Sequence, residues 1–145
     1  MSLSLWMLLA FASWTLLVLL VGVGVYRWRL ILTGQAMLTS FPGDTPHGAA
    51  AYRRATRAHA NCIENLPVFG AIILTAAAAG LSPPQMGPLA VATVAARVVQ
   101  TSIHMGLPES NVTIGFRFSF YTVQALAMIA MTVLIVLAAI AHRNG

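Results

Sequence analysis

The stretch RATRAHANCIENLPVF, residues 54–69, carries the most polar side chains of a chain that is otherwise mostly apolar. With the preceding arginine, its polar residues recur at offsets of 4, 4 and 3 positions: Arg53, Arg57, Asn61 and Glu64. On a helix these offsets keep the four side chains within about 80° of one another. Grouped guanidinium groups bind anions through charge-assisted hydrogen bonds, so this stripe predicts a site for a negatively charged guest.

Two later segments carry similar stripes. The first consists of residues that share a helical face within about 100°: Arg97, Gln100, Thr101 and His104. The second consists of Arg117, Tyr121 and Gln124. Polar side chains in lipid are expected to turn toward the protein interior or a water-filled cavity. We therefore expect three helices to direct polar side chains toward the protein interior, a water-filled cavity or the boundaries between subunits of a homotrimer, near one face of the membrane.

Glu64 and Arg97 are expected to form an ion pair at one depth. Glu64 lies seven residues beyond Arg57, and Arg97 lies seven residues before His104 in a returning helix. At 1.5 Å per residue each offset is roughly 10 Å. An unpaired charge at that depth is costly, which favours pairing, whether the pair is purely structural or also serves a ligand. Arg57 and Arg117 would then remain unpaired, which favours an anionic guest.

Some of these residues also fit simpler roles. Four arginines at segment ends fit residues that set membrane topology and extend to the interface: Arg27, Arg29, Arg53 and Arg54. Tyr121 and Gln124 fit hydrogen bonds between helices as well as ligand contacts.

The composition places the chain in a bilayer. Of its 145 residues 59% are hydrophobic and 8% are charged, against about 25% charged in a soluble domain. The net charge of +5 comes from eight arginines without lysine, which is too sparse a basic surface for nucleic acid. A single cysteine and the lack of Cys/His ligand spacings predict neither an intrachain disulfide nor a metal site.

Four apolar segments are long enough to cross the bilayer as helices: Leu3–Tyr26, Ala49–Ala79, Pro88–Met105 and Gly115–Ile140. The first reads as a retained span, because it is longer than the apolar run of a secretory signal and has no basic residues before it. The expected fold is an all-α integral membrane four-helix bundle, with residues 1–145 forming one domain.

The arginines also predict an orientation. Six of the eight lie near one end of the predicted spans: Arg27, Arg29, Arg53, Arg54, Arg57 and Arg117. Because short cytosolic loops are rich in basic residues, we expect this end to be cytosolic and both termini to be non-cytosolic. In a bacterium the chain would lie in the inner membrane.

The run RAHANCIENLPVF closely resembles the second-helix signature of the MAPEG family, the membrane-associated proteins in eicosanoid and glutathione metabolism. In that signature arginine, asparagine, glutamate and proline follow one another at spacings of 4, 3 and 3, which here are Arg57, Asn61, Glu64 and Pro67. The resemblance extends over the whole chain in length and four-span layout. It includes Arg97 of AARVVQ and Arg117 at the start of the fourth span.

The resemblance implies a homotrimer that binds glutathione between neighbouring subunits near the cytosolic face. By analogy, Arg117 would stabilise the glutathione thiolate as the catalytic residue. The residues implied to hold glutathione as co-substrate are Arg53, Arg57, Asn61, Glu64, Gln100, His104 and Tyr121. The second substrate would be lipophilic and would arrive through the bilayer.

Three functions remain open at this point. The first is a glutathione-dependent transferase or peroxidase that acts on a lipophilic electrophile or hydroperoxide. The second is a non-catalytic membrane protein of the same fold that binds a lipid or a partner, since Gln100 and His104 stand where family members often have tyrosines. The third is a proton-coupled transporter with Glu64 as the titrating group, which nearby cations disfavour.

Overall fold

The computed structural model describes residues 1–42 and 47–144, and the described residues form helices and connecting segments without a strand. The first span runs through α1 (Leu3–Leu17), the π-helical segment η1 (Val18–Gly24) and α2 (Val25–Leu32). The other spans are α3 (Ala50–Ala78), α4 (Met86–Gly106) and α5 (Asn111–Arg143), and a short 3-10 turn, η2 (Leu38–Ser40), follows the first. Among the described residues, four helices are thus long and apolar enough to cross a membrane, as the sequence predicted.

Two spans extend a turn or more beyond their predicted apolar segments. The first helix continues past Tyr26 to Leu32, because Arg27 finds a partner within the bundle: its Nε donates to the Tyr52 hydroxyl at 2.6 Å. The helix ends where Gly34 adopts a φ of 70°, a conformation that glycine takes without steric cost. The last helix begins at Asn111, where the Ser110 hydroxyl accepts from Thr113 N at 3.1 Å.

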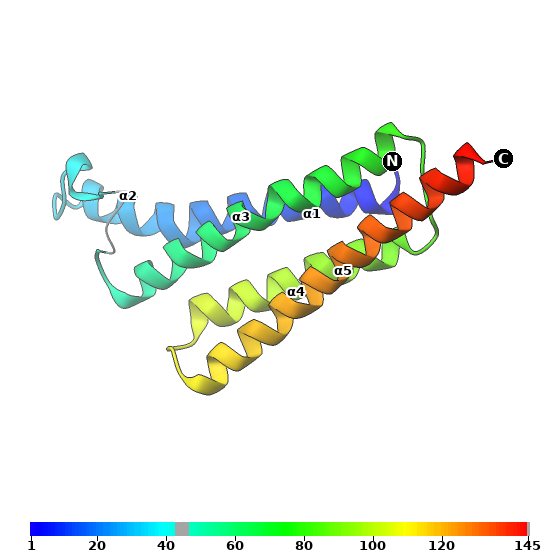
Figure 1. Ribbon diagram of the computed structural model, residues 1–145. Helices are drawn as coiled ribbons and strands as arrows, with labels where there is room; N and C mark the ends of the chain where they lie inside the picture. The colour runs from blue at the N-terminus through cyan, green and yellow to red at the C-terminus, as the bar shows by residue number, and fades with distance from the viewer. Residues whose placement is uncertain (43–46, 145) are drawn as a thin grey trace.

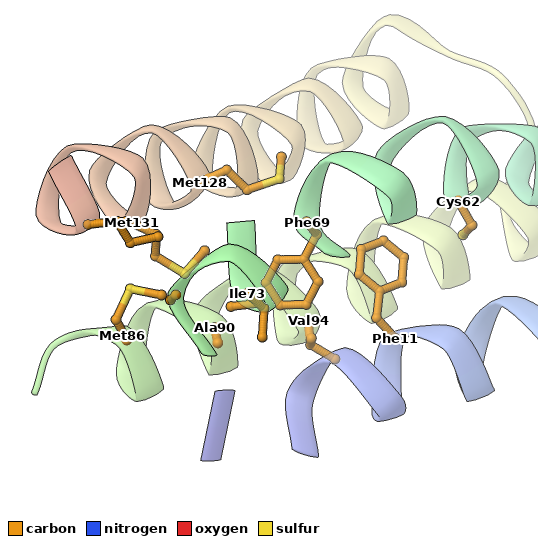
Figure 2. Packing of buried hydrophobic residues seen from close by; sticks show 11 residues of the cluster. Phe11, Cys62, Phe69, Ile73, Met86, Ala90, Val94, Met128 and Met131 are labelled. Atoms are coloured by element: carbon orange, nitrogen blue, oxygen red, sulfur yellow. The ribbon is translucent and has the colours of Figure 1, made fainter. Parts of the chain in front are cut away.

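The main apolar core lies toward the end of the bundle that carries both termini (Figure 1). Each of the four spans contributes to it, with Phe11 from α1, Phe69 from α3, Ala90 from α4 and Met131 from α5 (Figure 2). The rings of Phe11 and Phe69 are 5.6 Å apart between centroids. Helices in lipid associate through such close packing, because lipid tails are as apolar as the side chains.

A second contact holds the opposite end. Gly22 in η1 lies so close to α3 and α4 that a Cβ there would meet the Ala55 Cβ at 3.1 Å and the Met105 Cε at 2.9 Å. Farther along, the rings of Tyr26 and Tyr52 stack with centroids 4.4 Å apart. These contacts fix the first turns of α3, which carry three of the arginines.

Both chain termini lie at one end of the bundle, and the start of α3 and the turn between α4 and α5 lie at the other (Figure 1). We call this second end the arginine end. It carries Arg53, Arg54 and Arg57 at the start of α3 and Arg117 near the start of α5.

Candidate functional site

The polar stripe of α3 faces outward. Arg53, Arg57 and Glu64 are exposed and Asn61 is half-buried. The opposite face of this helix is buried and consists of small or apolar side chains: Tyr52, Ala55, Ala58, Cys62 and Phe69. Packing thus uses the apolar face of α3, and the polar stripe lies on the outer surface of the subunit and not in its interior.

An arginine-lined cleft opens between the start of α3 and the turn that joins α4 to α5. It has a volume of about 350 Å³, and its lining consists of Ala50, Arg53, Arg54, Arg57, Pro108 and Glu109. Arg54 Nε donates to the Met105 carbonyl at 3.2 Å. Arg53 Nη1 donates to the Gly48 carbonyl at 2.9 Å. In these bonds each guanidinium donates one N–H to a backbone carbonyl. A guanidinium carries five N–H donors, so others remain.

Arg57 forms an ion pair at the rim of this cleft. Its Nη1 lies 3.3 Å from Glu109 Oε1, and the two side chains are 62% and 49% exposed. The expectation that Arg57 is unpaired is therefore wrong. Arg54 and Glu109 were also missed as cleft residues. The sequence indicated Glu109 only as an acidic residue that follows Pro108 in a loop at the same end of the predicted bundle.

Glu64 and Arg97 form no direct ion pair in the part of the chain that the structure describes, although Glu64 is among the groups that act electrostatically on Arg97. Glu64 is exposed on α3, whereas Arg97 is 1% exposed inside the bundle. Cys62 explains the separation, because it is completely buried and Glu64 lies two positions later, roughly 200° around the helix. Counting residues along two helices gives depth, but it does not give the direction of a side chain.

Arg97 instead packs against an aromatic ring. Its guanidinium carbon lies 5.6 Å from the centroid of Phe11, a cation–π distance. Within residues 1–42 and 47–144, its Nε and Nη2 have no hydrogen-bond acceptor. The neighbouring face of α4 is polar as well, and Thr101 Oγ1 lies 3.6 Å from Cys62 Sγ. Inward burial of the polar face of α4 agrees with the sequence-based expectation.

Two glutamines join α4 to α5. Gln124 Nε2 donates to Gln100 Oε1 at 3.0 Å, and Gln100 Nε2 donates to the Arg117 carbonyl at 3.1 Å. Both side chains are buried. Gln124 thus forms a hydrogen bond between helices, which is one of the two roles that its sequence position suggested. Gln100, expected to hold a ligand, uses its amide on the protein itself.

A groove of about 200 Å³ lies beside these glutamines and is lined by Gln100, Ile114, Arg117, Phe118 and Tyr121. Arg117 is half-buried, and its Nε has no acceptor among the described residues. Tyr121 is 45% exposed. The groove thus brings together three of the polar residues singled out from the sequence, with apolar side chains around them.

His104 lies near both the cleft and the groove. It is buried on α4, and the charged groups that act on it electrostatically are Arg54, Arg57, Glu109 and Arg117. Its Nε2 has no hydrogen-bond partner within the described ranges. The arginine end therefore concentrates positive charge around one buried imidazole.

The chain matches the MAPEG family over residues 5–137, which is nearly its whole length. The chain belongs to the MAPEG family. It is therefore a membrane protein of the family associated with glutathione and eicosanoid metabolism, and its four membrane-capable helices fit the four-helix bundle of that family. Comparisons with curated proteins and with solved structures gave no match.

We predict that Gln100 and Gln124 stabilise this MAPEG bundle as a coupled pair. Replacing each by Leu, singly and together, should give a coupling energy of about 0.6 kcal/mol and at most about 1.7 kcal/mol, the range of polar pairs inside membrane proteins. Reversible unfolding in mixed micelles measures it. Strictly additive losses would contradict the pairing.

Proposed function

We propose that the chain is a membrane-bound glutathione-dependent transferase or peroxidase that acts on a lipophilic electrophile or hydroperoxide. The observation that carries this proposal is the concentration of arginines at one end of a MAPEG bundle. Three of them line a cleft, and a fourth lies in a neighbouring groove whose other walls are partly apolar. Such a site suits an anionic thiol compound beside an apolar partner.

The outward stripe of α3 matches the charges of glutathione. The two carboxylates of the tripeptide suit the guanidinium groups of Arg53 and Arg57, which bind carboxylates through paired bonds. Its amino group suits Glu64, which is exposed and has no ion-pair partner among the described residues. Asn61 lies between these charges at helical spacing and can donate to or accept from the peptide groups.

Arg117 is the candidate for activation of the thiol. A thiol is nucleophilic only as the thiolate, and an adjacent guanidinium stabilises that anion. Arg117 and Tyr121 both line this groove, and the buried Nε of Arg117 has no acceptor among the described residues. The bond from Gln100 to the Arg117 carbonyl ties the backbone of this turn of α5 to α4.

The same groove offers a place for the lipophilic substrate. Ile114 and Phe118 line it and are exposed on the surface of the bundle. In a transferase the thiolate sulfur would bond to an electrophilic carbon, and either a leaving group departs with its bonding electrons or the π bond of an activated double bond breaks and the neighbouring carbon takes up a proton. In a peroxidase it would attack the terminal oxygen of the hydroperoxide, break the O–O bond and yield an alcohol and a sulfenic acid, which a second glutathione converts to the disulfide and water.

We further propose that the arginine end faces the cytosol and that the protein assembles as a homotrimer. The exposed carboxylate of Glu64 lies seven residues along α3 from Arg57, which is roughly 10 Å at 1.5 Å per residue. Contact of such a charge with lipid costs about 2.5–3.5 kcal/mol on insertion scales. A neighbouring subunit over this face, with glutathione between the two, would remove that contact.

The binding role predicts that Arg57→Ala weakens glutathione binding. Loss of a charge-assisted bond worth about 1.5–3 kcal/mol corresponds to a dissociation constant about 10- to 100-fold higher. Equilibrium titration in detergent measures the change. Arg143→Ala, at the end of α5 that carries the C-terminus, is the matched control and should bind like the parent. Equal binding by Arg57→Ala and the parent would remove Arg57 from the site.

The activation role predicts that Arg117→Ala forms less thiolate and turns over more slowly, with a modest effect on glutathione affinity. The ultraviolet absorbance of the thiolate on mixing with glutathione measures this directly, with Arg143→Ala again as the control. Full thiolate formation by Arg117→Ala would show that this role is wrong. No thiolate in the parent would favour a binding protein of the same fold over an enzyme.

The proposed homotrimer should have the mass of three chains. Native mass spectrometry after release from detergent gives the number of chains directly. A stable monomer or dimer would contradict the homotrimer.

A further inference from the structure

Glu109 is the acidic residue that lines the arginine cleft, among the residues that the structure describes. It belongs to the short turn between Gly106, the last residue of α4, and Asn111, the first of α5. Pro108 precedes it and limits the backbone. Ser110 follows it and caps α5 through Thr113 N. This turn holds a carboxylate against a cleft whose other charged side chains are arginines.

The ion pair that Glu109 makes with Arg57 is weak by its geometry. One oxygen and one nitrogen meet at 3.3 Å, in contrast to the shorter, paired bonds of a bidentate contact. Both side chains are about half exposed or more, and exposed pairs of this kind contribute little to stability. A ligand carboxylate that meets Arg57 in bidentate geometry can therefore displace it.

We propose that Glu109 is an internal competitor that occupies Arg57 in the empty site and must leave when a carboxylate of glutathione binds. This inference rests on the proposed function and names a residue that sets the affinity of that same site. Glu109 lowers the affinity because it holds donors of Arg57 that a carboxylate of the ligand needs.

A role for Glu109 in orienting Arg57 predicts a change in glutathione affinity of the opposite sign. If the ion pair served to orient Arg57 for the ligand, removal of the carboxylate would weaken glutathione binding. If Glu109 competes, removal strengthens it. Glu109→Gln separates the two, because the amide keeps the size of the side chain and removes its charge.

The experiment is an equilibrium titration of the full chain in detergent with glutathione, for the parent, Glu109→Gln, Arg57→Ala and the double variant. Glu109→Gln should lower the dissociation constant by about two- to fivefold, the scale of an exposed ion pair. In the Arg57→Ala background the same change should alter the constant by much less, because the contested guanidinium is gone.

The outcomes of this titration distinguish the competitor from the proposed function. Weaker or unchanged binding by Glu109→Gln, in a parent that binds glutathione, overturns the competitor and leaves the proposed function intact. An equal gain in both backgrounds also overturns it, because the effect would then be general repulsion. A parent that binds no glutathione overturns the proposed function itself, and the competitor with it.

Discussion

The orientation of α3 about its own axis decides where the charged groups of the arginine end lie. The helix buries Tyr52, Ala55, Ala58 and Cys62, which leaves Arg57 and Glu64 on its outer face. Burial of the opposite face would place both charges inside the bundle, where each needs a partner to offset the cost of losing water. With the observed orientation of α3 about its axis, Arg57 lines an open cleft and Glu64 lies on an outer surface. The anion site that we propose at this end depends on that orientation.

The polar face of α4 is buried and finds only some of its partners. Gln124 donates one hydrogen bond to Gln100 across the contact with α5, and Arg97 lies over the ring of Phe11. The glutamine pair also fixes the turn of α5 that carries Arg117. One structural contact therefore positions the residue to which we assign thiol activation, while the guanidinium itself keeps an unused donor.

The sequence predicted the fold well and the site in part. Four spans followed from apolar length, and burial of the polar face of α4 followed from helical spacing. The Glu64–Arg97 pair failed because residue counting gives depth, whereas the direction of Glu64 depends on which face of α3 packs. The pairing of Arg57 with Glu109 depends on how a short turn folds back toward α3, for which the sequence carries no periodic signal. The extension of the first helix to Leu32 likewise depends on the contact of Arg27 with Tyr52.

We propose that the arginine end of this MAPEG protein binds glutathione. Isothermal titration calorimetry of the detergent-solubilised parent with glutathione measures this binding. Saturable binding is expected, and it should weaken as salt is added, because guanidinium–carboxylate contacts are screened. The absence of saturable binding at millimolar glutathione would contradict it.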